Sequence, residues 1–424
     1  MIGEKMIALA KELYPINRSL TGEGVRETLR ILKRENPELE IHSVPTGYKA
    51  FDWEVPKEWN CFDAYIITPD GKKICDYKKN NLHVVQYSIP IEKELSLKEL
   101  QKHLYSYEKL PDAIPYVTSY YNKTWGFCIS ENERKKLKPG KYKVVIKSEL
   151  KNGELNYADL VIAGKSDKEI MFSTYICHPS MVNNELSGPV LATFLAKYIK
   201  SKDNYYTYRF VFAPETIGSL VYMSKHLKHL KEKVKAGYIL TCVGDERAYS
   251  YLPSRYGNTL ADKVALNVLN YEIKKFKKYS FLDRGSDERQ YCSPGADLPF
   301  CSVMRSKYAT YPEYHTSKDD FNLVTAKGLE DSYKLYTKII DVLENNFYYQ
   351  TTVIGEPQLG KRGLYPNTCS PKTNYELAFL YRNFLAYADG NNDLVDIADI
   401  IGVSAYKLID VAKLFLKHGL VKVV

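Results

Sequence analysis

Apolar runs typical of strands alternate with helical patterns between residues 157 and 345. Runs rich in β-branched and aromatic residues occur at 159–163, 170–175, 208–213, 237–243 and 300–303. Helical segments separate or follow them, at 189–199, 219–231, 259–271 and 326–345. Strands that alternate with helices form crossover units, so the pattern predicts an α/β fold. Its mostly parallel sheet is expected to be flanked by helices on both faces.

The first forty residues have the periodicity of helices instead. Their apolar positions predict one helix over 3–14 and a second over 24–35. The link between them is polar and rich in glycine, and it supplies Thr21 as the expected N-cap of the second helix.

A β-rich stretch follows, from about residue 41 to 150. Its short alternating runs are broken by turn sequences such as Pro69-Asp70-Gly71, which predicts a separate unit of short strands. All three tryptophans of the chain lie in this stretch. Two of them, Trp59 and Trp125, could pack in the core of this unit or roof a cleft.

The last part of the chain reads as a small winged-helix unit. It is preceded by a linker rich in glycine and proline, with Gly355, Pro357, Gly360, Gly363, Pro366 and Pro371. Helical patterns over 373–387, 394–401 and 404–418 then lead into an apolar terminal strand. The helix over 404–418 has an apolar stripe and few side chains suited to base edges, so packing or protein contact is favoured over DNA binding.

Composition and charge narrow the class of protein. A chain of 424 residues is too long for one ordinary core, and its net charge of +9 comes from lysines scattered among glutamates rather than from a basic patch. No apolar run is long enough to cross a membrane, and the start lacks the features of a signal peptide, which predicts a cytoplasmic protein. The eight cysteines include no C-x-x-C pair, so reduced thiols are expected.

Three polar clusters carry the expected chemistry, and each follows a β-rich run. The first begins at His178 and continues to Gly188, the second contains Glu215, and the third begins at His315. The ends of strands in an open α/β sheet deliver side chains to a common site. Two histidines and a glutamate delivered in this way are the parts of a metal-assisted hydrolase.

Each of these residues also has a simpler interpretation. His178 could be a loop residue at the end of its strand, and Glu215 could be a helix-capping carboxylate. Asn184 lies where an N-cap is favoured, although its oxygen could equally bind the metal, with Gly188 packed closely on the sheet. For His315, the neighbouring hydroxyls and carboxylates, Asp319 among them, could orient a ligating imidazole.

Four further polar residues are candidates for the same site. Asp245 follows a predicted strand and offers a carboxylate oxygen to a metal. Asp287 and Glu288 lie in one polar segment and could contribute carboxylates. The adjacent Arg289 could hold a substrate carboxylate or be a surface ion-pair residue.

The three clusters, in this order, resemble the di-zinc aminopeptidases of the bacterial leucyl aminopeptidase and glutamate carboxypeptidase type. The matching residues are His178, Asn183-Asn184-x-x-Ser187-Gly188, Glu215 and His315-Thr316-x-x-Asp319. The resemblance covers residues 1–40 and 155–348. It implies the fold of a zinc aminopeptidase, with Glu215 in the place of the general base.

The whole chain resembles more closely the aminopeptidase-like proteins of uncertain function associated with polysaccharide-biosynthesis genes. The segments that carry this likeness are 17–22, 82–88, 119–121, 125–128 and 214–218. The likeness implies an aminopeptidase-like catalytic domain over 1–40 and 155–348, an inserted β-rich domain over 41–154, and a linker with a winged-helix domain over 349–424.

The chain departs from the di-zinc pattern at four positions. Neutral residues replace the expected carboxylates, namely Ser180, Asn184, Thr216 and Thr241. A second metal would therefore lose most of its ligands, and the resemblance implies one zinc ion rather than two. Its expected ligands are His178, His315 and an oxygen of Asn184 or Asp245.

Two functions of different classes follow. The first is a zinc-dependent aminopeptidase-like hydrolase of amide or peptide bonds, with metal-activated water and Glu215 as general base. The second is a catalytically degenerate binding or scaffold protein of polysaccharide biosynthesis that retains the peptidase fold. The expected partners are a small peptide or amide substrate and, through the insert or the winged helix, another protein. Neither a membrane nor a nucleic acid is expected as a partner.

Overall fold

The computed structural model describes residues 1–364 and 372–424. These form two compact units. The first unit comprises Met1–Thr259 and Lys277–Tyr333, and the second comprises Leu260–Phe276 and Lys334–Val424. Three residues of the predicted C-terminal part, Pro366, Cys369 and Pro371, lie outside the described residues. The division of the chain at 41–154 and 349–424 stays a prediction.

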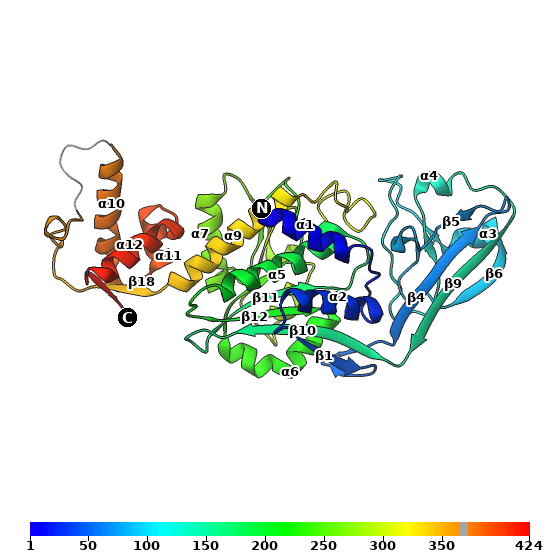
Figure 1. Ribbon diagram of the computed structural model, residues 1–424, viewed down its shortest axis with the longest axis horizontal. Helices are drawn as coiled ribbons and strands as arrows, with labels where there is room; N and C mark the ends of the chain where they lie inside the picture. Colours follow the sequence, from blue (N-terminus) through cyan, green and yellow to red (C-terminus); the bar gives the residue numbers. More distant parts are fainter. Residues whose placement is uncertain (365–371) are drawn as a thin grey trace. The chain divides into compact units, whose positions relative to one another are not determined.

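An eight-stranded sheet forms the centre of the first unit (Figure 1). In spatial order its strands are β1 (Glu40–Pro45), β10 (Glu154–Ile162), β12 (Thr207–Ala213), β11 (Glu169–Tyr175), β13 (Val234–Ile239), β16 (Phe300–Met304), β14 (Ser250–Leu252) and β15 (Lys277–Lys278). The four central strands, β12, β11, β13 and β16, run parallel to their neighbours in this group. Strand β10 is antiparallel to both β1 and β12. The predicted α/β fold with a mostly parallel centre is confirmed.

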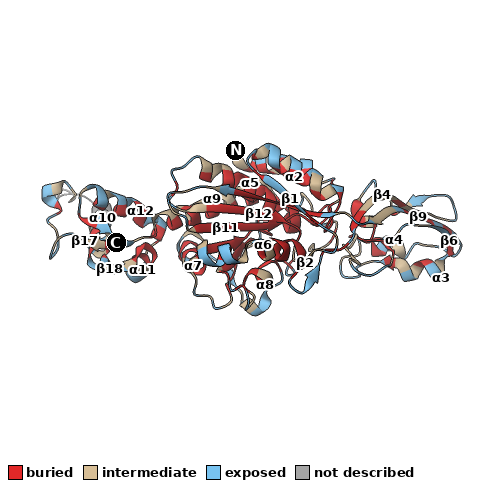
Figure 2. Ribbon diagram, turned by 90° about the horizontal axis from the view of Figure 1, so that it is seen from below, coloured by how far each residue is buried: buried red, intermediate tan, exposed pale blue. Residues whose placement is uncertain are grey.

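Helices cover both faces of this sheet. Helices α1 (Ile2–Leu13), α2 (Glu23–Glu35) and α5 (Ser187–Lys200) lie on one face, and α6 (Ile217–Lys233) lies on the other (Figure 1). Every residue of β11 is buried, as expected for a parallel strand covered from both sides (Figure 2). No helix in the described part of the chain is both long and apolar enough to cross a membrane.

The start of α2 differs from the prediction that Thr21 caps it. The N-cap is Gly22, whose φ of +99° places it in a conformation that glycine adopts without strain. The Thr21 hydroxyl instead lies 2.7 Å from the Tyr87 hydroxyl and accepts a hydrogen bond from the backbone N–H of Trp59. The prediction is wrong because tertiary partners from the β-rich segment occupy the side chain that would have capped the helix.

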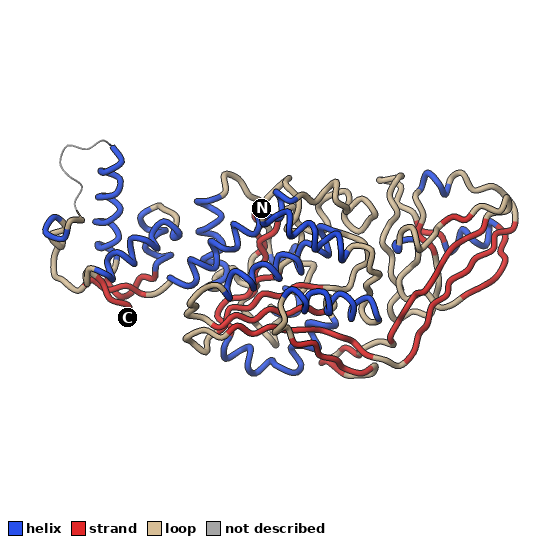
Figure 3. The backbone as a smooth tube through the Cα atoms, in the orientation of Figure 1, coloured by secondary structure: helices blue, strands red, loops and turns tan. Residues whose placement is uncertain are grey.

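The β-rich segment of the first unit consists mainly of strands and loops (Figure 3). Its four-stranded antiparallel sheet has the order β5 (Lys73–Ile74), β4 (Glu58–Ile67), β9 (Lys141–Lys151) and β6 (Ile91–Ser96). Smaller pairs are β2 (Lys49–Ala50) with β3 (Trp53–Glu54), and β7 (Leu104–Tyr105) with β8 (Phe127–Cys128). Its short helices are α3 (Leu97–Leu100) and α4 (Glu131–Arg134).

Two of the three tryptophans pack inside this segment. Trp59 is buried, and its indole N–H donates a hydrogen bond to the carbonyl oxygen of Ser88. Trp125 is also buried and stacks on His103, with 3.8 Å between the ring centroids. Of the two roles left open for them, core packing is therefore the one observed.

The second unit has the outline of a winged helix. Its helices α10 (Lys372–Tyr387), α11 (Leu394–Ile401) and α12 (Ala405–Lys417) accompany a three-stranded antiparallel sheet of β18 (Asp389–Asp393), β17 (Tyr348–Thr351) and β19 (Val421–Val423). Three more α-helices lie in the described residues. They are α7 (Leu260–Glu272) of the second unit, the short α8 (Glu288–Tyr291) of the first unit, and α9 (Ala326–Asn345), whose sequence spans both units. Gly402, at a φ of +72°, ends α11 and makes the predicted break before α12.

Gly188 packs against the sheet as predicted. A Cβ atom at this position would lie 2.2 Å from the carbonyl oxygen of Leu240 and 2.4 Å from the hydroxyl of Thr174. Both neighbours belong to buried parts of the sheet edge and have little freedom to move. Only glycine therefore allows α5 to begin so close to the strands.

We expect Gly188→Ala to lower the free energy of unfolding by about 1–3 kcal/mol, the usual cost of forcing extra atoms into a packed core. Chemical unfolding of the purified protein measures this difference. Gly295→Ala is the matched control, because a Cβ there would meet nothing within 4 Å. Equal stability of the two variants would contradict the close packing.

Candidate active site

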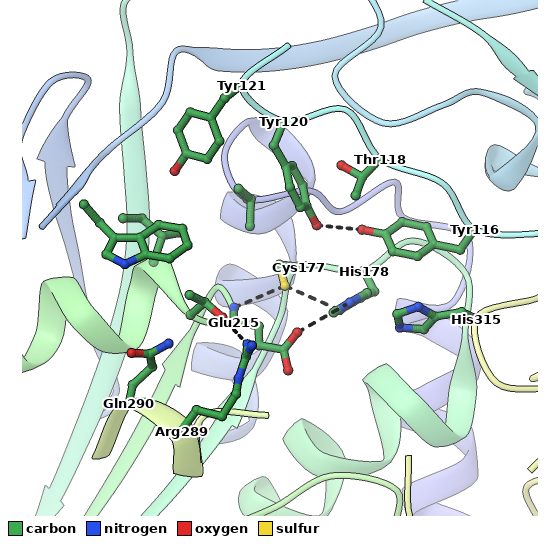
Figure 4. Close-up of a pocket in the computed structure, with 14 residues that line it drawn as sticks. Tyr116, Thr118, Tyr120, Tyr121, Cys177, His178, Glu215, Arg289, Gln290 and His315 are labelled. Carbon is green, nitrogen blue, oxygen red and sulfur yellow. Dashed lines mark hydrogen bonds and ion pairs between the residues drawn. The ribbon is translucent and has the colours of Figure 1, made fainter. Parts of the chain in front are cut away.

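A cavity of about 360 Å³ lies at the carboxyl ends of β11 and β12. Its lining includes His178, which follows β11, and Glu215, which follows β12. The two strands are parallel neighbours, so the residues that follow them reach the same edge of the sheet. His315 lines the same cavity, and the structure thus brings together the three residues that the sequence singled out (Figure 4).

His178 is buried and directs one ring nitrogen to the cavity. Its Nδ1 lies 3.0 Å from Glu185 Oε2, and because a carboxylate only accepts hydrogen bonds, this contact places the ring proton on Nδ1. Its Nε2 is 3.8 Å from Glu215 Oε2. Burial, together with the charge of Arg18, lowers the pKa of His178 to about 3, so the ring is neutral. A neutral imidazole whose Nδ1 is held by a carboxylate is the form that binds metals through Nε2.

The carboxylate that orients His178 belongs to a buried ion pair. Arg18 Nε lies 3.4 Å from Glu185 Oε1, and both side chains are fully buried. Arg18 also donates hydrogen bonds to the carbonyl oxygens of His178 and Leu13. Burial raises the pKa of Glu185, whereas the positive charge of Arg18 and the hydrogen bond from it favour the carboxylate form. Sequence reasoning missed both residues.

Glu215 lies in a strained turn between β12 and α6. Its backbone N–H donates to the Cys177 sulfur at 3.2 Å, and the next residue, Thr216, has a φ of +65°. Asp287 holds the turn by accepting hydrogen bonds from the Thr216 N–H and the Ser219 hydroxyl. Burial, with the Asp287 charge as a second cause, raises the pKa of Glu215. A carboxylate with a raised pKa is suited to accept a proton near neutral pH.

Asp287 and Glu288, the two acidic residues that precede Arg289, hold the backbone around the site. Asp287 fixes the Glu215 turn, and its own pKa is raised to about 6 by burial. Glu288 accepts hydrogen bonds from the backbone N–H groups of Gly285 and Ser286 and from the Tyr308 hydroxyl. Neither carboxylate is among the residues that line the cavity.

His315 faces His178 across the cavity, with 5.3 Å between the ring centroids. Its ring stacks on Tyr314 and meets the edge of Tyr116. Burial, with His178 as a second cause, lowers the pKa of His315 well below its usual value. Its Nε2 is buried and has no hydrogen-bond partner among the described residues. A buried nitrogen without a partner is costly unless a ligand such as a metal ion completes it.

Asp319, one of the carboxylates near His315 in the sequence, serves another role. Asp319 does not hold the imidazole, because its oxygens accept the backbone N–H groups of Val182, Asn183 and Asn184 and the Tyr311 hydroxyl. The carboxylate thereby fastens the helical turn Val182–Leu186. Of the neighbouring groups that could orient His315, Asp319 is therefore not one, since the N–H groups at the start of this turn have no partner within the turn and bind the carboxylate instead.

The two oxygen ligands expected from the sequence do not line the cavity. Asn184 Oδ1 accepts a hydrogen bond of 2.9 Å from the Tyr175 hydroxyl, which also lies 2.6 Å from the Thr241 hydroxyl. The Asp245 carboxylate is fully buried and accepts from the Asn183 amide and from the N–H and hydroxyl of Ser306. The structure therefore does not bring Asp245 to the two histidines, because local donors already saturate it.

The donor set fits one metal ion better than two. Two neutral imidazoles and the Glu215 carboxylate face one cavity, and no described residue forms a hydrogen bond with His315 Nε2. A second ion would need charged ligands, whereas Asn184 and Thr241 are neutral and both bond to Tyr175. The compact cluster of Cys177, His178 and Glu185 is closed by its own hydrogen bonds and by Arg18.

A loop of the β-rich segment, residues 114–120, covers one side of the cavity; we call it the strap. The backbone N–H of Tyr116 donates to the carbonyl oxygen of His315, and that of Ile114 donates to the Ser317 hydroxyl. The hydroxyls of Tyr116 and Tyr120 lie 2.8 Å apart over the site (Figure 4). Segments about 200 residues apart in the sequence thus form one enclosure.

Comparison with known proteins gives two family matches. A family model described as "Domain of unknown function (DUF4910)" matches residues 7–346, and a winged helix-turn-helix model matches residues 346–423. A curated protein of Clostridium acetobutylicum is 44% identical over 400 residues, which cover 93% of this chain and 91% of that protein. Its name is "Putative polysaccharide biosynthesis protein with aminopeptidase-like domain".

Several solved structures share the fold of this chain. The crystal structure of a putative peptidase from Clostridium acetobutylicum is 42% identical, with a TM-score of 0.93 over 100% of this chain and 96% of that chain. A zinc aminopeptidase from Bacillus subtilis is 12% identical, with a TM-score of 0.57 over 80% of this chain and 93% of that chain. A peptidase M28 precursor from Shewanella amazonensis has a TM-score of 0.54 at 13% identity, over 84% of this chain and 98% of that chain. The last two similarities concern the fold alone.

Proposed function

Since the chain belongs to the DUF4910 family and has an aminopeptidase-like fold, we propose that it is a zinc-dependent hydrolase of amide or peptide bonds. In this proposal His178 and His315 hold a single ion, and Glu215 is the general base. The name of the curated relative supports a role in polysaccharide biosynthesis. Amino-acid amides, small peptides and N-acylated sugars are the substrates to test first.

The arrangement of His178, His315 and Glu215 carries the proposal. Two imidazoles kept neutral by burial face each other at 5.3 Å, and one of them is 3.8 Å from a carboxylate oxygen. A purely structural cluster would satisfy its buried nitrogens internally, whereas His315 Nε2 has no partner among the described residues.

In the proposed reaction, each side chain of the site has a separate role. A bound zinc ion would polarise the scissile carbonyl and lower the pKa of a water molecule. Glu215 accepts the proton of the attacking water and passes it to the leaving amine. Glu185 keeps His178 in the required orientation, and the strap around Tyr116 limits the access of bulk water.

The purified protein is expected to contain about one zinc ion per chain, as for catalytic sites built on few protein ligands. His178→Ala and His315→Ala should each lose it, because each variant removes one of the two imidazoles. Elemental analysis after dialysis measures the stoichiometry, with circular dichroism to confirm that the variants fold. His418→Ala, at the end of α12 in the second unit, is the control and should retain the ion. Metal retained in both site variants would contradict the assignment.

The neutral residues around Tyr175 favour the second candidate, a binding or scaffold protein that keeps the fold without the chemistry. Tyr175, Asn184 and Thr241 form a buried hydrogen-bonded group, and the resemblance to di-zinc aminopeptidases implies carboxylates in place of Asn184 and Thr241. The winged helix or the β-rich segment would then contact a protein partner. Absence of bound zinc after the ion is added back would favour this alternative.

A further inference from the structure

One wall of the cavity carries a positioned cation that the proposed reaction does not use. Arg289 Nε donates to the carbonyl oxygen of Ser286, and Nη2 donates to the Thr216 hydroxyl at 2.9 Å. These two bonds fix the guanidinium beside Glu215 (Figure 4). No carboxylate among residues 1–364 and 372–424 forms an ion pair with it, although its positive charge acts on Glu215 and Asp287 and opposes the rise of their pKa values.

Gln290 adds an unused amide to the same wall. Its side chain lines the cavity and makes no hydrogen bond within the described parts of the chain. Arg289 and Gln290 lie on the same side of the cavity in Figure 4. A guanidinium and an amide side by side are well suited to bind a carboxylate, because the planar donors match its two oxygens.

The opposite wall is aromatic. Tyr120 and Tyr121 lie across the cavity from Arg289 and Gln290 (Figure 4). Trp53 from the hairpin of β2 and β3 lines the same cavity and remains partly exposed to solvent. Flat aromatic side chains favour a ligand with a flat or apolar face. His178, His315 and Glu215 line the same cavity as these two walls.

We propose that the cavity selects amide substrates that carry a carboxylate, held by Arg289 with Gln290, and a ring packed on the tyrosine wall. This inference rests on the proposed hydrolase function and names its substrate class. Two classes of compound could supply such a carboxylate. One is the terminal carboxylate of a peptide or N-acyl amino acid, and the other is the carboxylate of an N-acylated amino-sugar acid.

A structural role for Arg289 makes a different prediction. If its only task were to tether Thr216, substitution would alter the stability of the turn but would not distinguish a charged ligand from a neutral one of the same shape. The comparison of matched ligands therefore separates the two roles. It also does not depend on turnover, so it stays informative whether or not hydrolysis is found.

The experiment is calorimetric binding of two matched pairs of probes to the full chain. The first pair is N-acetylphenylalanine and N-acetylphenylalanine amide, and the second is N-acetylglucosaminuronic acid and N-acetylglucosamine. At least one acid should bind about tenfold more tightly than its neutral partner, the contribution of a charge-assisted hydrogen bond at a partly solvated site. The pair with the larger difference identifies the source of the carboxylate.

Variants of Arg289 and of a second arginine supply the controls. Arg289→Gln should abolish the preference for the acid, and Arg289→Lys, which keeps the charge without the fork, should retain part of it. Arg284→Gln, an exposed arginine outside the cavity lining, should leave the preference unchanged. Equal binding of acid and neutral probe, a preference that persists in Arg289→Gln, or no binding of either acid at millimolar concentration would each overturn the proposal. Loss of hydrolysis in Glu215→Gln with this preference intact would support both proposals separately.

Discussion

Glu215→Gln is expected to lower the turnover of an amide substrate by about 10²–10⁴-fold, the usual contribution of a general base. Glutamine keeps the size of the side chain and its hydrogen-bonding atoms, but it cannot accept the proton of the attacking water. The substitution leaves His178 and His315 in place, so the zinc content should not change. Steady-state kinetics with the best substrate of the initial screen, combined with elemental analysis, measures both quantities.

The matched control for this variant is Glu54→Gln. Glu54 ends the hairpin of β2 and β3, is exposed, and does not line the cavity. The same chemical change there should leave turnover unaltered. Unchanged turnover in Glu215→Gln would exclude Glu215 as the base and would favour the scaffold function.

The bounds of helices and strands were predictable from the sequence where the pattern of apolar residues alone determines them. The helix predicted over 326–345 has these bounds in α9, because its apolar periodicity runs the whole length. The strand predicted over 237–243 ends at Ile239 in β13. Its apolar run continues, and the backbone N–H of Leu240 still donates to the carbonyl oxygen of Ser173 on β11, but Cys242 has a φ of +52°, outside the β region. Hydrophobicity predicts burial here, and backbone conformation decides where the strand ends.

The residues of the candidate site were likewise predictable only where a local sequence pattern marks them. His178 and Glu215 follow strands, and this local signal was enough to place them at one edge of the sheet. It could not separate them from Asp245, which also follows a predicted strand but points to donors on Asn183 and Ser306. The pairing of Arg18 with Glu185 left no local signal, because the two residues lie far apart in the chain. Such contacts are set by packing and not by any short pattern.

The Arg18–Glu185 pair gives the second large expected effect, this time on stability. Arg18→Met should lower the free energy of unfolding by about 3–5 kcal/mol, because it leaves the buried Glu185 carboxylate without its cation. The variant also removes the hydrogen bonds to the carbonyl oxygens of Leu13 and His178, which join the end of α1 to the site. Chemical unfolding followed by fluorescence measures the change. Arg34→Met, an exposed arginine on α2, is the control and should have little effect.

A double variant tests whether the loss comes from the unpaired charge. Glu185→Gln keeps an acceptor for His178 Nδ1 while removing the carboxylate, so Arg18→Met combined with Glu185→Gln should be more stable than Arg18→Met alone. Removing both charges of a buried pair costs less than removing one, because no charge is left without a partner. If the two substitutions were simply additive, the pair would contribute nothing through its charges. The orientation of His178 would then depend on the hydrogen bond from its Nδ1 and not on the buried arginine.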